Sequence, residues 1–305
     1  MSIVNTTIPI TAASVSDTIS RLVQAFPDFR TEVLGTTAFQ RPLQTLVLGN
    51  GPKKLLYTAA HHANEWITAL VLLKFAEDYG TALKNRTQLA GTDMEALNKA
   101  VTIYMVPLVN PDGVDLVTGA VQVGDIQYEL AKRISEDYPN IPFPDGWKAN
   151  LLGTDLNLNY PAGWLQAREI KYSQGYVSPA PRDFVGTAPL NQLETQALSG
   201  YTEAIDPALI LAFHTQGQEI YWQFNDIDIP GAKELGEKLA SVSGYRLADV
   251  PYNSAFAGYK DWFIKMFRRP GYTIEAGLGV NPLPLSQFDE IYSQCLPILL
   301  TAATA

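Results

Sequence analysis

Hydrophobic residues in this chain fall either into continuous runs or into stretches with helical spacing. An amphipathic helix is predicted over 14–26, because apolar residues recur there every three or four positions. The continuous apolar run at 54–60 predicts a buried strand, and the Asn50-Gly51-Pro52 sequence before it predicts a hairpin-type turn. Further strands are predicted at 32–34, 43–48, 101–106, 209–213 and 272–274, and further helices at 66–83, 90–99, 127–136, 230–243 and 285–300.

Strands and helices alternate along most of the chain, which is typical of sheets with parallel neighbouring strands. We therefore expect an α/β fold with a mixed, mostly parallel twisted sheet flanked by helices on both faces. Residues 119–190 depart from this alternation and are rich in Pro, Gly, Asn and Tyr, and such long irregular segments are usually functional loops. No Gly/Ser-rich linker divides the chain, so we expect one domain over 1–305 with a short N-terminal extension at 1–13.

Polar residues follow several predicted strands close to the point where each strand ends. His62, His214 and Glu275 come at or just after the ends of three strands, and Asn110 begins a polar loop that we expect at 110–113 after a fourth. In open α/β sheets, ligands bind beyond the carboxyl ends of the strands. We therefore expect these side chains to meet in one site.

The chain contains only three histidines, His61, His62 and His214, and all three follow predicted strands. Glu65 comes three residues after His62, so a tight turn can direct both side chains at one metal ion. Two imidazoles, one carboxylate and an open fourth position form a typical catalytic zinc set. The spacing alone leaves another interpretation open, in which Glu65 caps a helix beside a hydrogen-bonded histidine. Glu275, taken by itself, is equally a solvated acid at the end of a strand.

Five segments resemble, in the same order, the signatures of carboxypeptidase A-like zinc peptidases. They are A-H-H-A-N-E-W-I-T at 60–68, V-N-P-D-G at 109–113, G-T-D-L-N at 153–157, A-F-H-T at 212–215 and Y-T-I-E at 272–275. Asp261-Trp262 precedes the last segment at the family's distance. The resemblance covers most of the chain, and it implies the zinc carboxypeptidase fold and a zinc metallopeptidase activity.

The resemblance also implies a role for each of the polar side chains. His62, Glu65 and His214 would hold one zinc ion per chain. Glu275 would be the general base that takes a proton from water and passes it to the leaving amine. Asp155 would accept a hydrogen bond from a ligand imidazole and so fix its tautomer.

Other positions depart from the family's pattern. The family follows its G-x-D-x-N segment with an arginine that grips the terminal carboxylate of the substrate, whereas here Leu158 follows Asn157. Lys148 is the only cation where the family has an oxyanion-stabilising arginine, and lysine lacks the planar fork of arginine. Tyr252 lies one residue from the position of the family's mobile substrate-covering tyrosine, and a core or rim aromatic is the alternative. The candidate catalytic residues are therefore Glu275, Lys148 and Tyr252, the candidate substrate-binding residues include Asn157 and Leu158, and His61 is expected to be a neighbour of the site.

The segments H-H-A-N-E-W, W-K-A-N, D-L-N and P-A-P-R-D-F together resemble those of bacterial γ-D-glutamyl-L-diamino acid endopeptidases. The resemblance implies hydrolysis of the bond between the side-chain carboxyl of D-glutamate and meso-diaminopimelate, or L-lysine, in cell-wall peptides. Arg182 is a candidate reader of a substrate carboxylate, and a structural loop arginine is the alternative. Three other functions stay open: a carboxypeptidase acting on ordinary peptides, an N-acyl-amino-acid deacylase, and an inactive homologue that binds peptides.

Composition narrows the range of partners. The 31 Asp and Glu residues outnumber the 22 Lys and Arg residues, the formal net charge is −9, and a nucleic-acid partner is not expected. No apolar stretch is long enough for a transmembrane helix and no signal peptide is visible, so we expect no membrane partner and a cytoplasmic location. The single Cys295 is expected to be a buried, inert thiol. The expected partner is a muropeptide or peptide substrate, and the sequence leaves the oligomeric state open.

Overall fold

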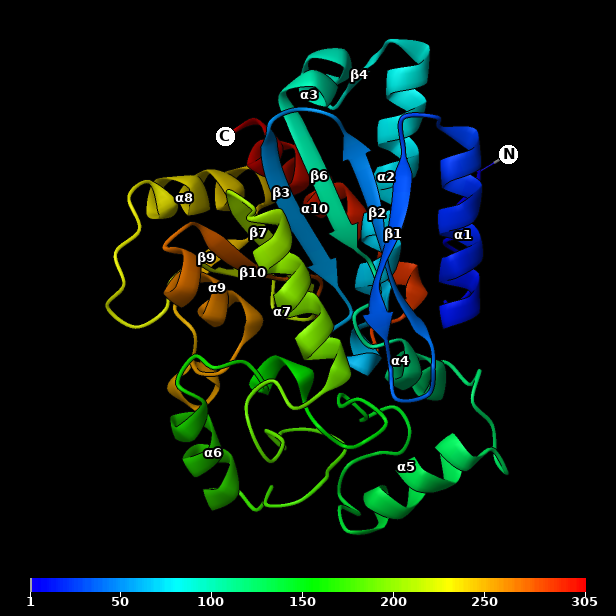
Figure 1. The fold of residues 1–305 in the computed structure, drawn as a ribbon, viewed down its shortest axis with the longest axis vertical. Coiled ribbons are helices and arrows are strands. Elements are labelled where there is room, and N and C mark those ends of the chain that lie inside the picture. Colours follow the sequence, from blue (N-terminus) through cyan, green and yellow to red (C-terminus); the bar gives the residue numbers. More distant parts are fainter. Residues whose placement is uncertain (1) are drawn as a thin grey trace.

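The computed structural model describes residues 2–305, and its centre is one eight-stranded sheet (Figure 1). The strands are β1 (Arg30–Thr36), β2 (Pro42–Gly49), β3 (Lys53–Ala59), β6 (Val101–Val106), β7 (Leu209–His214), β8 (Glu219–Tyr221), β9 (Arg246–Ala248) and β10 (Gly271–Glu275). Their order in the sheet is β1-β2-β6-β3-β7-β10-β8-β9. The pairs β6/β3, β3/β7, β7/β10 and β8/β9 are parallel, and the other three are antiparallel. The expected mixed, mostly parallel sheet is confirmed.

Helices cover both faces of this sheet. They are α1 (Ala12–Ala25), α2 (Ile67–Asn85), α3 (Met94–Ala100), α4 (Pro111–Val117), α5 (Ile126–Glu136), α6 (Trp164–Ser173), α7 (Leu193–Ile205), α8 (Ala232–Ser243), α9 (Tyr259–Phe267) and α10 (Phe288–Thr304). Single turns η1 (Ala63–Glu65), η2 (Leu156–Leu158), η3 (Tyr252–Ser254) and η4 (Leu285–Gln287) and a small sheet of β4 (Gln88–Leu89) and β5 (Thr92–Asp93) complete the described elements. Among residues 2–305, no helix is long and apolar enough to cross a membrane.

The central strands are buried on both faces, because successive side chains along a strand point to opposite sides of the sheet. In β3, Leu55 and Tyr57 belong to the core formed with α2 and α10, whereas Leu56 belongs to the core formed with α7 and α9. A strand in this position needs an apolar residue at nearly every place, which explains the continuous run in the sequence. Val4 and Ile10 of the N-terminal extension pack into the first of these cores.

Two local expectations were wrong. The turn at 50–52 joins β2 to β3, but β6 lies between these strands, so they do not form a hairpin. The polar segment at 110–113, expected to be a loop, begins helix α4 instead. Asn110 caps this helix by accepting the N–H of Gly113 at 3.1 Å, and Pro111 occupies the first turn. The sequence pattern also missed helices α6, α7 and α9 and the short strands β8 and β9.

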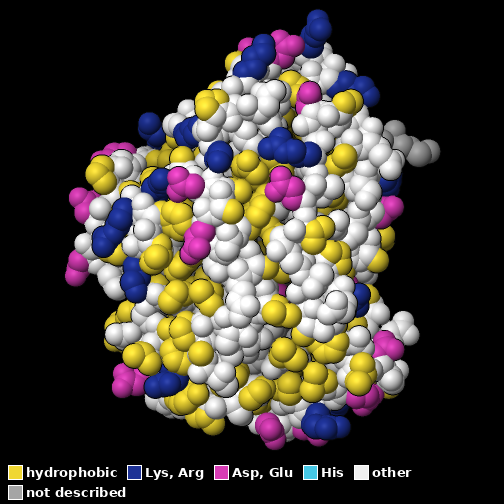
Figure 2. All heavy atoms as spheres, in the orientation of Figure 1, with side chains coloured by type: hydrophobic (Ala, Val, Ile, Leu, Met, Phe, Trp, Pro, Cys, Tyr) yellow, Lys and Arg dark blue, Asp and Glu magenta, His cyan; other side chains and the backbone are white. Residues whose placement is uncertain are grey.

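Residues 119–190, which comprise helices α5 and α6 and the loops around them, form a layer beside the carboxyl ends of the central strands, drawn in green in Figure 1. The segment has small cores of its own, one around Trp147 and Leu151 and one around Trp164 and Val185. Figure 2 shows hydrophobic side chains interspersed over this part of the face, with charged side chains mainly at its margin. These loops are therefore packed in fixed positions next to the strand ends.

Candidate metal and catalytic site

Three strands direct side chains to one point beyond their carboxyl ends. Strand β7 ends with His214 and β10 ends with Glu275, and these two residues are register partners in a parallel pair. After β3 the chain places His62 in an extended conformation and Glu65 in the single turn η1. Segments that lie far apart in the sequence therefore share one place in the fold.

His62, Glu65 and His214 form a buried cluster with the donor set of a catalytic zinc site. Nδ1 of His62 lies 2.9 Å from Oε1 of Glu65, and Nδ1 of His214 lies 2.8 Å from Oε2. The two Nδ1 atoms are 3.2 Å apart, and Nε2 of His62 lies 3.0 Å from Oδ1 of Asp155. The contact between His62 and Asp155 is a hydrogen bond when Nε2 of His62 carries the proton. Nδ1 of His62 then presents its lone pair to the cluster. The three residues fit zinc and would hold it, while His61 is a buried neighbour whose ring stacks on His214.

The charges of the cluster favour a bound cation. Burial disfavours a charged imidazole, but Glu65 raises the pKa of His62 to about 9. Burial alone would raise the pKa of Glu65 and of Asp155, but His62 holds both pKa values below their usual range. The backbone N–H of Thr215 adds a hydrogen bond to Oε2 of Glu65 at 3.3 Å. Both carboxylates are therefore ionised, as metal binding requires.

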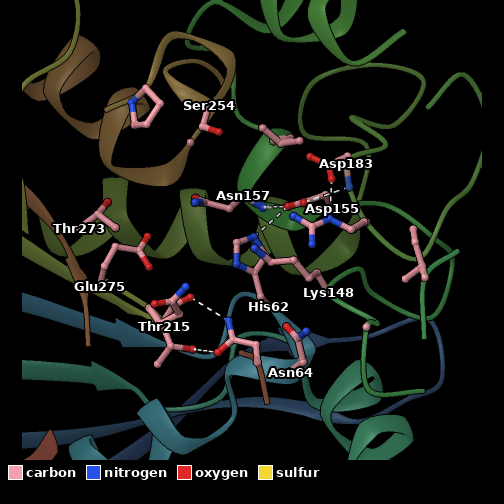
Figure 3. A pocket seen from close by; sticks show the side chains of 18 of the residues that line it. His62, Asn64, Lys148, Asp155, Asn157, Asp183, Thr215, Ser254, Thr273 and Glu275 are labelled. Atoms are coloured by element: carbon pink, nitrogen blue, oxygen red, sulfur yellow. Dashed lines mark hydrogen bonds and ion pairs between the residues drawn. The ribbon is translucent and has the colours of Figure 1, made fainter. Parts of the chain in front are cut away.

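Two further ionisable groups, Glu275 and Lys148, lie on opposite sides of His62 (Figure 3). Nζ of Lys148 lies 3.2 Å from Oε1 of Glu65. Burial, together with the charge of Glu65, raises the pKa of Glu275 to about 8. A carboxyl group whose pKa lies near the working pH can both accept and release a proton readily.

The loop around Asp183 supports the carboxylate that orients His62. The backbone N–H of Asp183 donates to Oδ2 of Asp155 at 3.2 Å, and its φ of 66° lies in the left-handed region. Its own carboxylate lies 2.5 Å from Nζ of Lys171 and 2.6 Å from Nε of Arg182. Sequence reasoning missed Asp183 and Lys171, although the P-A-P-R-D-F segment at 179–184 was a signal for the first of them.

A cavity of about 1270 Å³ opens over the cluster. The sequence-predicted residues that line it are His62, Lys148, Asp155, Asn157, Leu158, Arg182 and Glu275. Oδ1 of Asn157 is fixed by the backbone N–H of Tyr259 at 2.9 Å. Tyr252 does not belong to this wall, because its side chain is 69% exposed and packs edge-on against Phe256. Its role in covering the substrate stays a prediction.

Comparison with known proteins places these residues in a family. The chain matches the zinc carboxypeptidase (peptidase M14) family over residues 15–294. It is 41% identical over 282 residues to gamma-D-glutamyl-L-diamino acid endopeptidase 1 of Lysinibacillus sphaericus, which covers 92% of this chain and 69% of that protein. It is also 35% identical over 292 residues to the uncharacterized protein YqgT of Bacillus subtilis, covering 95% of this chain and 76% of the relative.

Solved structures share the fold at low sequence identity. Bovine thrombin-activatable fibrinolysis inhibitor superposes with a TM-score of 0.71 at 16% identity, covering 98% of this chain and 97% of that one. Murein-tripeptide amidase MpaA from Escherichia coli O157 superposes with a TM-score of 0.55 at 22% identity, covering 89% and 91%. The residues matched to the family span His62, Glu65, His214 and Glu275, and the family expected from the sequence motifs is confirmed. The chain belongs to the zinc carboxypeptidase family and is a zinc metallopeptidase.

Proposed function

We propose that this metallopeptidase hydrolyses the γ-D-glutamyl bond to a diamino acid in peptides from bacterial cell walls. The observation that carries the proposal is the 41% identity, over 92% of the chain, to a protein named for this activity. The cavity supports it through two features, an arginine fork and an apolar residue where ordinary carboxypeptidases bind a carboxylate.

In the proposed reaction, Glu275 takes a proton from the attacking water and passes it to the leaving amine. When bound, zinc supplies a Lewis acid that acidifies water and polarises the scissile carbonyl. Lys148 brings positive charge to the place where negative charge develops on the carbonyl oxygen, and its Nζ lies 3.2 Å from the ligand oxygen of Glu65. Asp155 keeps the imidazole of His62 in the required tautomer.

A γ-glutamyl substrate differs from an ordinary peptide in the position of its carboxylates. The α-carboxylate of γ-linked D-glutamate branches from the acyl side of the scissile bond and comes in addition to any carboxylate on the leaving side, whereas an ordinary carboxypeptidase substrate needs only its terminal carboxylate, which is on the leaving side. Arg182 lines the cavity, and Asp183 binds its Nε at 2.6 Å, which leaves both terminal amino groups without a partner among residues 2–305. These two amino groups of Arg182 can form a bidentate pair with a carboxylate on the acyl side of the scissile bond. Leu158 also lines the cavity and offers a terminal carboxylate nothing to bind.

The test compares kcat/KM for L-Ala-γ-D-Glu-meso-diaminopimelate with kcat/KM for a blocked dipeptide that ends in a free α-carboxylate. A charge-assisted hydrogen bond contributes about 1.5–3 kcal/mol, so we expect the zinc-loaded protein to favour the γ-glutamyl peptide by at least roughly tenfold. Leu158→Arg should raise kcat/KM for the blocked dipeptide, because it returns a cation for the terminal carboxylate. Arg182→Met should slow cleavage of the γ-glutamyl peptide, whereas Arg133→Met, an exposed change on α5 outside the cavity wall, should not.

Each alternative function has its own outcome in this assay. A wild-type preference for the ordinary dipeptide would identify a carboxypeptidase that recognises its terminus by another route. Failure to cleave either peptide would reject the proposal. Cleavage of N-acyl amino acids would then identify a deacylase, and tight binding of the peptides without turnover would identify an inactive homologue.

A further inference from the structure

The cavity continues away from Glu275, on the side of His62 where Asp183 lies (Figure 3). Oδ1 of Asp183 lies 2.5 Å from Nζ of Lys171, a residue near the end of α6. The backbone carbonyl of Lys171 accepts the N–H of Tyr176 at 3.0 Å. Tyr176 therefore lies on this side of the site, and it lines the cavity. The cavity thus has an arm that reaches Tyr176, far from the strand that carries Glu275.

The ring of Tyr176 is supported by a second tyrosine. The rings of Tyr138 and Tyr176 are stacked with their centroids 5.7 Å apart and their planes 11° from parallel. Tyr138 does not belong to the cavity wall, and its hydroxyl donates to the backbone carbonyl of Ser178 at 3.4 Å. Both rings are half-buried. Tyr176 is therefore held in place from outside the cavity and offers the arm a flat apolar surface.

Two amide side chains complete this arm. Asn140 and Gln174 line the cavity, and both are exposed. Their side chains form no hydrogen bond with any other group among residues 2–305, so the donors and the acceptor of each amide are free for a ligand. We call Tyr138, Asn140, Gln174 and Tyr176 the aromatic arm of the cavity.

The chemistry of the aromatic arm suits a sugar. A pyranose ring has a flat face of C–H groups, which packs against an aromatic ring, and a rim of hydroxyl groups, which bond to amides. None of the four side chains of the arm carries a charge, so a neutral polar ligand suits them better than an ion does. An aromatic ring next to free amides therefore points to a carbohydrate group.

In the proposed reaction, the aromatic arm faces the acyl half of the substrate. The general base hands its proton to the leaving amine, so the leaving residue lies on the side of Glu275 and the D-glutamyl half lies on the other side. There Arg182, whose Nε lies 2.6 Å from Oδ2 of Asp183, would hold the α-carboxylate of D-glutamate. The same carbon carries the amine that is joined to L-alanine, and one residue spans about 3.3–3.6 Å. The group attached to L-alanine is therefore directed towards Tyr176, and in a muropeptide this group is N-acetylmuramic acid.

We propose that the aromatic arm binds the sugar ring of N-acetylmuramic acid, so that the enzyme prefers peptides that still carry this sugar over the free peptides. The inference rests on the proposed function of the same cavity. A purely structural pair of tyrosines is the competing interpretation, since the stack also ties the chain after α5 to the chain after α6. A structural pair affects all substrates alike, whereas a binding surface affects only substrates with the sugar.

The experiment uses two substrates that differ in the sugar and not in charge at the alanine nitrogen. They are N-acetylmuramoyl-L-Ala-γ-D-Glu-meso-diaminopimelate and N-acetyl-L-Ala-γ-D-Glu-meso-diaminopimelate. For the zinc-loaded wild type we expect kcat/KM to be roughly three- to tenfold higher for the substrate with the sugar, because its ring packs on an aromatic face. Tyr176→Leu should cleave the two substrates at similar rates, and Tyr176→Phe should keep most of the preference because it keeps the flat ring. Tyr172→Leu, at an exposed tyrosine outside the cavity wall, should keep the wild-type ratio.

The outcomes separate this inference from the proposed function. Equal or slower cleavage of the substrate with the sugar by the wild type, or an unchanged ratio in Tyr176→Leu, would overturn the inference while the γ-D-glutamyl activity stands. If Tyr176→Leu does not fold, the double variant Asn140→Ala/Gln174→Ala decides, since both positions are exposed. Its preference for the sugar should fall, and an unchanged preference would overturn the inference. Cleavage of neither substrate, nor of the peptide with a free amine, would overturn the proposed function and the inference with it.

Discussion

Glu65 and Glu275 lie in one site, yet their surroundings shift their pKa values in opposite directions. Burial raises the pKa of both carboxyls. His62 and Lys148 more than offset this for Glu65, whereas the largest charge effect on Glu275 is repulsion from Glu65 itself. Glu65 is therefore ionised and suited to bind the metal, while Glu275 titrates near neutral pH, where a general base works best. Two glutamate side chains thus have different roles, metal binding and proton transfer, because their charged neighbours differ.

This difference leads to a prediction for Glu275→Gln. We expect the variant to retain one zinc per chain while kcat falls by about 10²–10⁴-fold, because the amide keeps the size of the side chain but accepts no proton. Metal analysis and hydrolysis of the γ-D-glutamyl peptide measure the two effects. Glu219→Gln is the matched control, since Glu219 is the register partner of Glu275 on β8, and it should keep most of the turnover. Loss of zinc together with turnover, as expected for His214→Ala, would make Glu275 a ligand or a residue needed for folding.

Single residues could be recognised from the sequence where their type is rare or their motif is local. Three histidines in the whole chain made His62 and His214 conspicuous. Asp183 was missed because its contact with Asp155 runs through the backbone N–H, which carries no side-chain signal.

Among the secondary-structure elements, the start of α4 organises the site. Oδ1 of Asn110 caps this helix through the N–H of Gly113, and Nδ2 donates to the carbonyl of His61 at 3.2 Å and of Ala149 at 3.0 Å. One side chain therefore holds the zinc-binding segment after β3 and the loop that carries Lys148 to the same helix end. The V-N-P-D-G segment thus links three parts of the fold: the segment after β3, the loop with Lys148 and the start of α4. We call this set of hydrogen bonds the brace.

We expect Asn110→Ala to lower the free energy of unfolding of the zinc-free protein by about 2–4 kcal/mol. The estimate adds a lost helix cap of about 1 kcal/mol to about 1–3 kcal/mol for buried carbonyls left without a donor. Urea unfolding of the wild type and of the variant measures this difference in the free energy of unfolding. Asn110→Ser keeps an oxygen for the cap but no donor, so it should fall between the wild type and Asn110→Ala. A change below about 0.5 kcal/mol in Asn110→Ala would show that the brace contributes nothing to stability.

Elements with long apolar or periodic runs were predictable, and short elements were not. The predicted strand at 101–106 coincides with β6, because a strand buried on both faces is one continuous apolar run. Strands β8 and β9 have three residues each, too few to show a period of two. Helix α9 has only nine residues, and its polar Lys260 and Asp261 are buried together with its apolar side chains, so the sequence shows no long amphipathic pattern there. The order of β2, β6 and β3 depends on the whole sheet and cannot be read from the local turn.

At the scale of the whole molecule, Glu194 links helix α7 to the loops that carry the site. Its side chain is 3% exposed, and its carboxylate oxygens lie 3.3 and 3.4 Å from Nδ2 of Asn150. Asn150 lies between Lys148 and Asp155 in the sequence. Burial, with repulsion from Asp112, raises the pKa of Glu194 to about 7. This carboxyl is therefore neutral in the folded protein at acidic pH and must ionise inside the fold as the pH rises.

The free energy of unfolding should therefore depend on pH through Glu194. Between its ordinary pKa of 4.5 and about 7, the folded chain binds more protons than the unfolded chain. The stability that the neutral carboxyl contributes is thus complete below pH 4.5 and is lost as the pH rises through about 7. The difference between the two pKa values corresponds to about 3 kcal/mol.

We expect Glu194→Gln not to lose this stability as the pH rises, because its neutral amide does not ionise. Urea unfolding at pH 4.5 and at pH 8, with the zinc content matched, should show the variant gaining about 3 kcal/mol on the wild type between the two conditions. The comparison cancels the pH dependence of the metal site, since both proteins share it. Glu203→Gln, at an exposed position on the same helix, should follow the wild type at both pH values. If Glu194→Gln also follows the wild type, then Glu194 ionises in the folded protein as easily as in the unfolded chain. The loops between α7 and the site must then give this carboxylate water or a compensating charge.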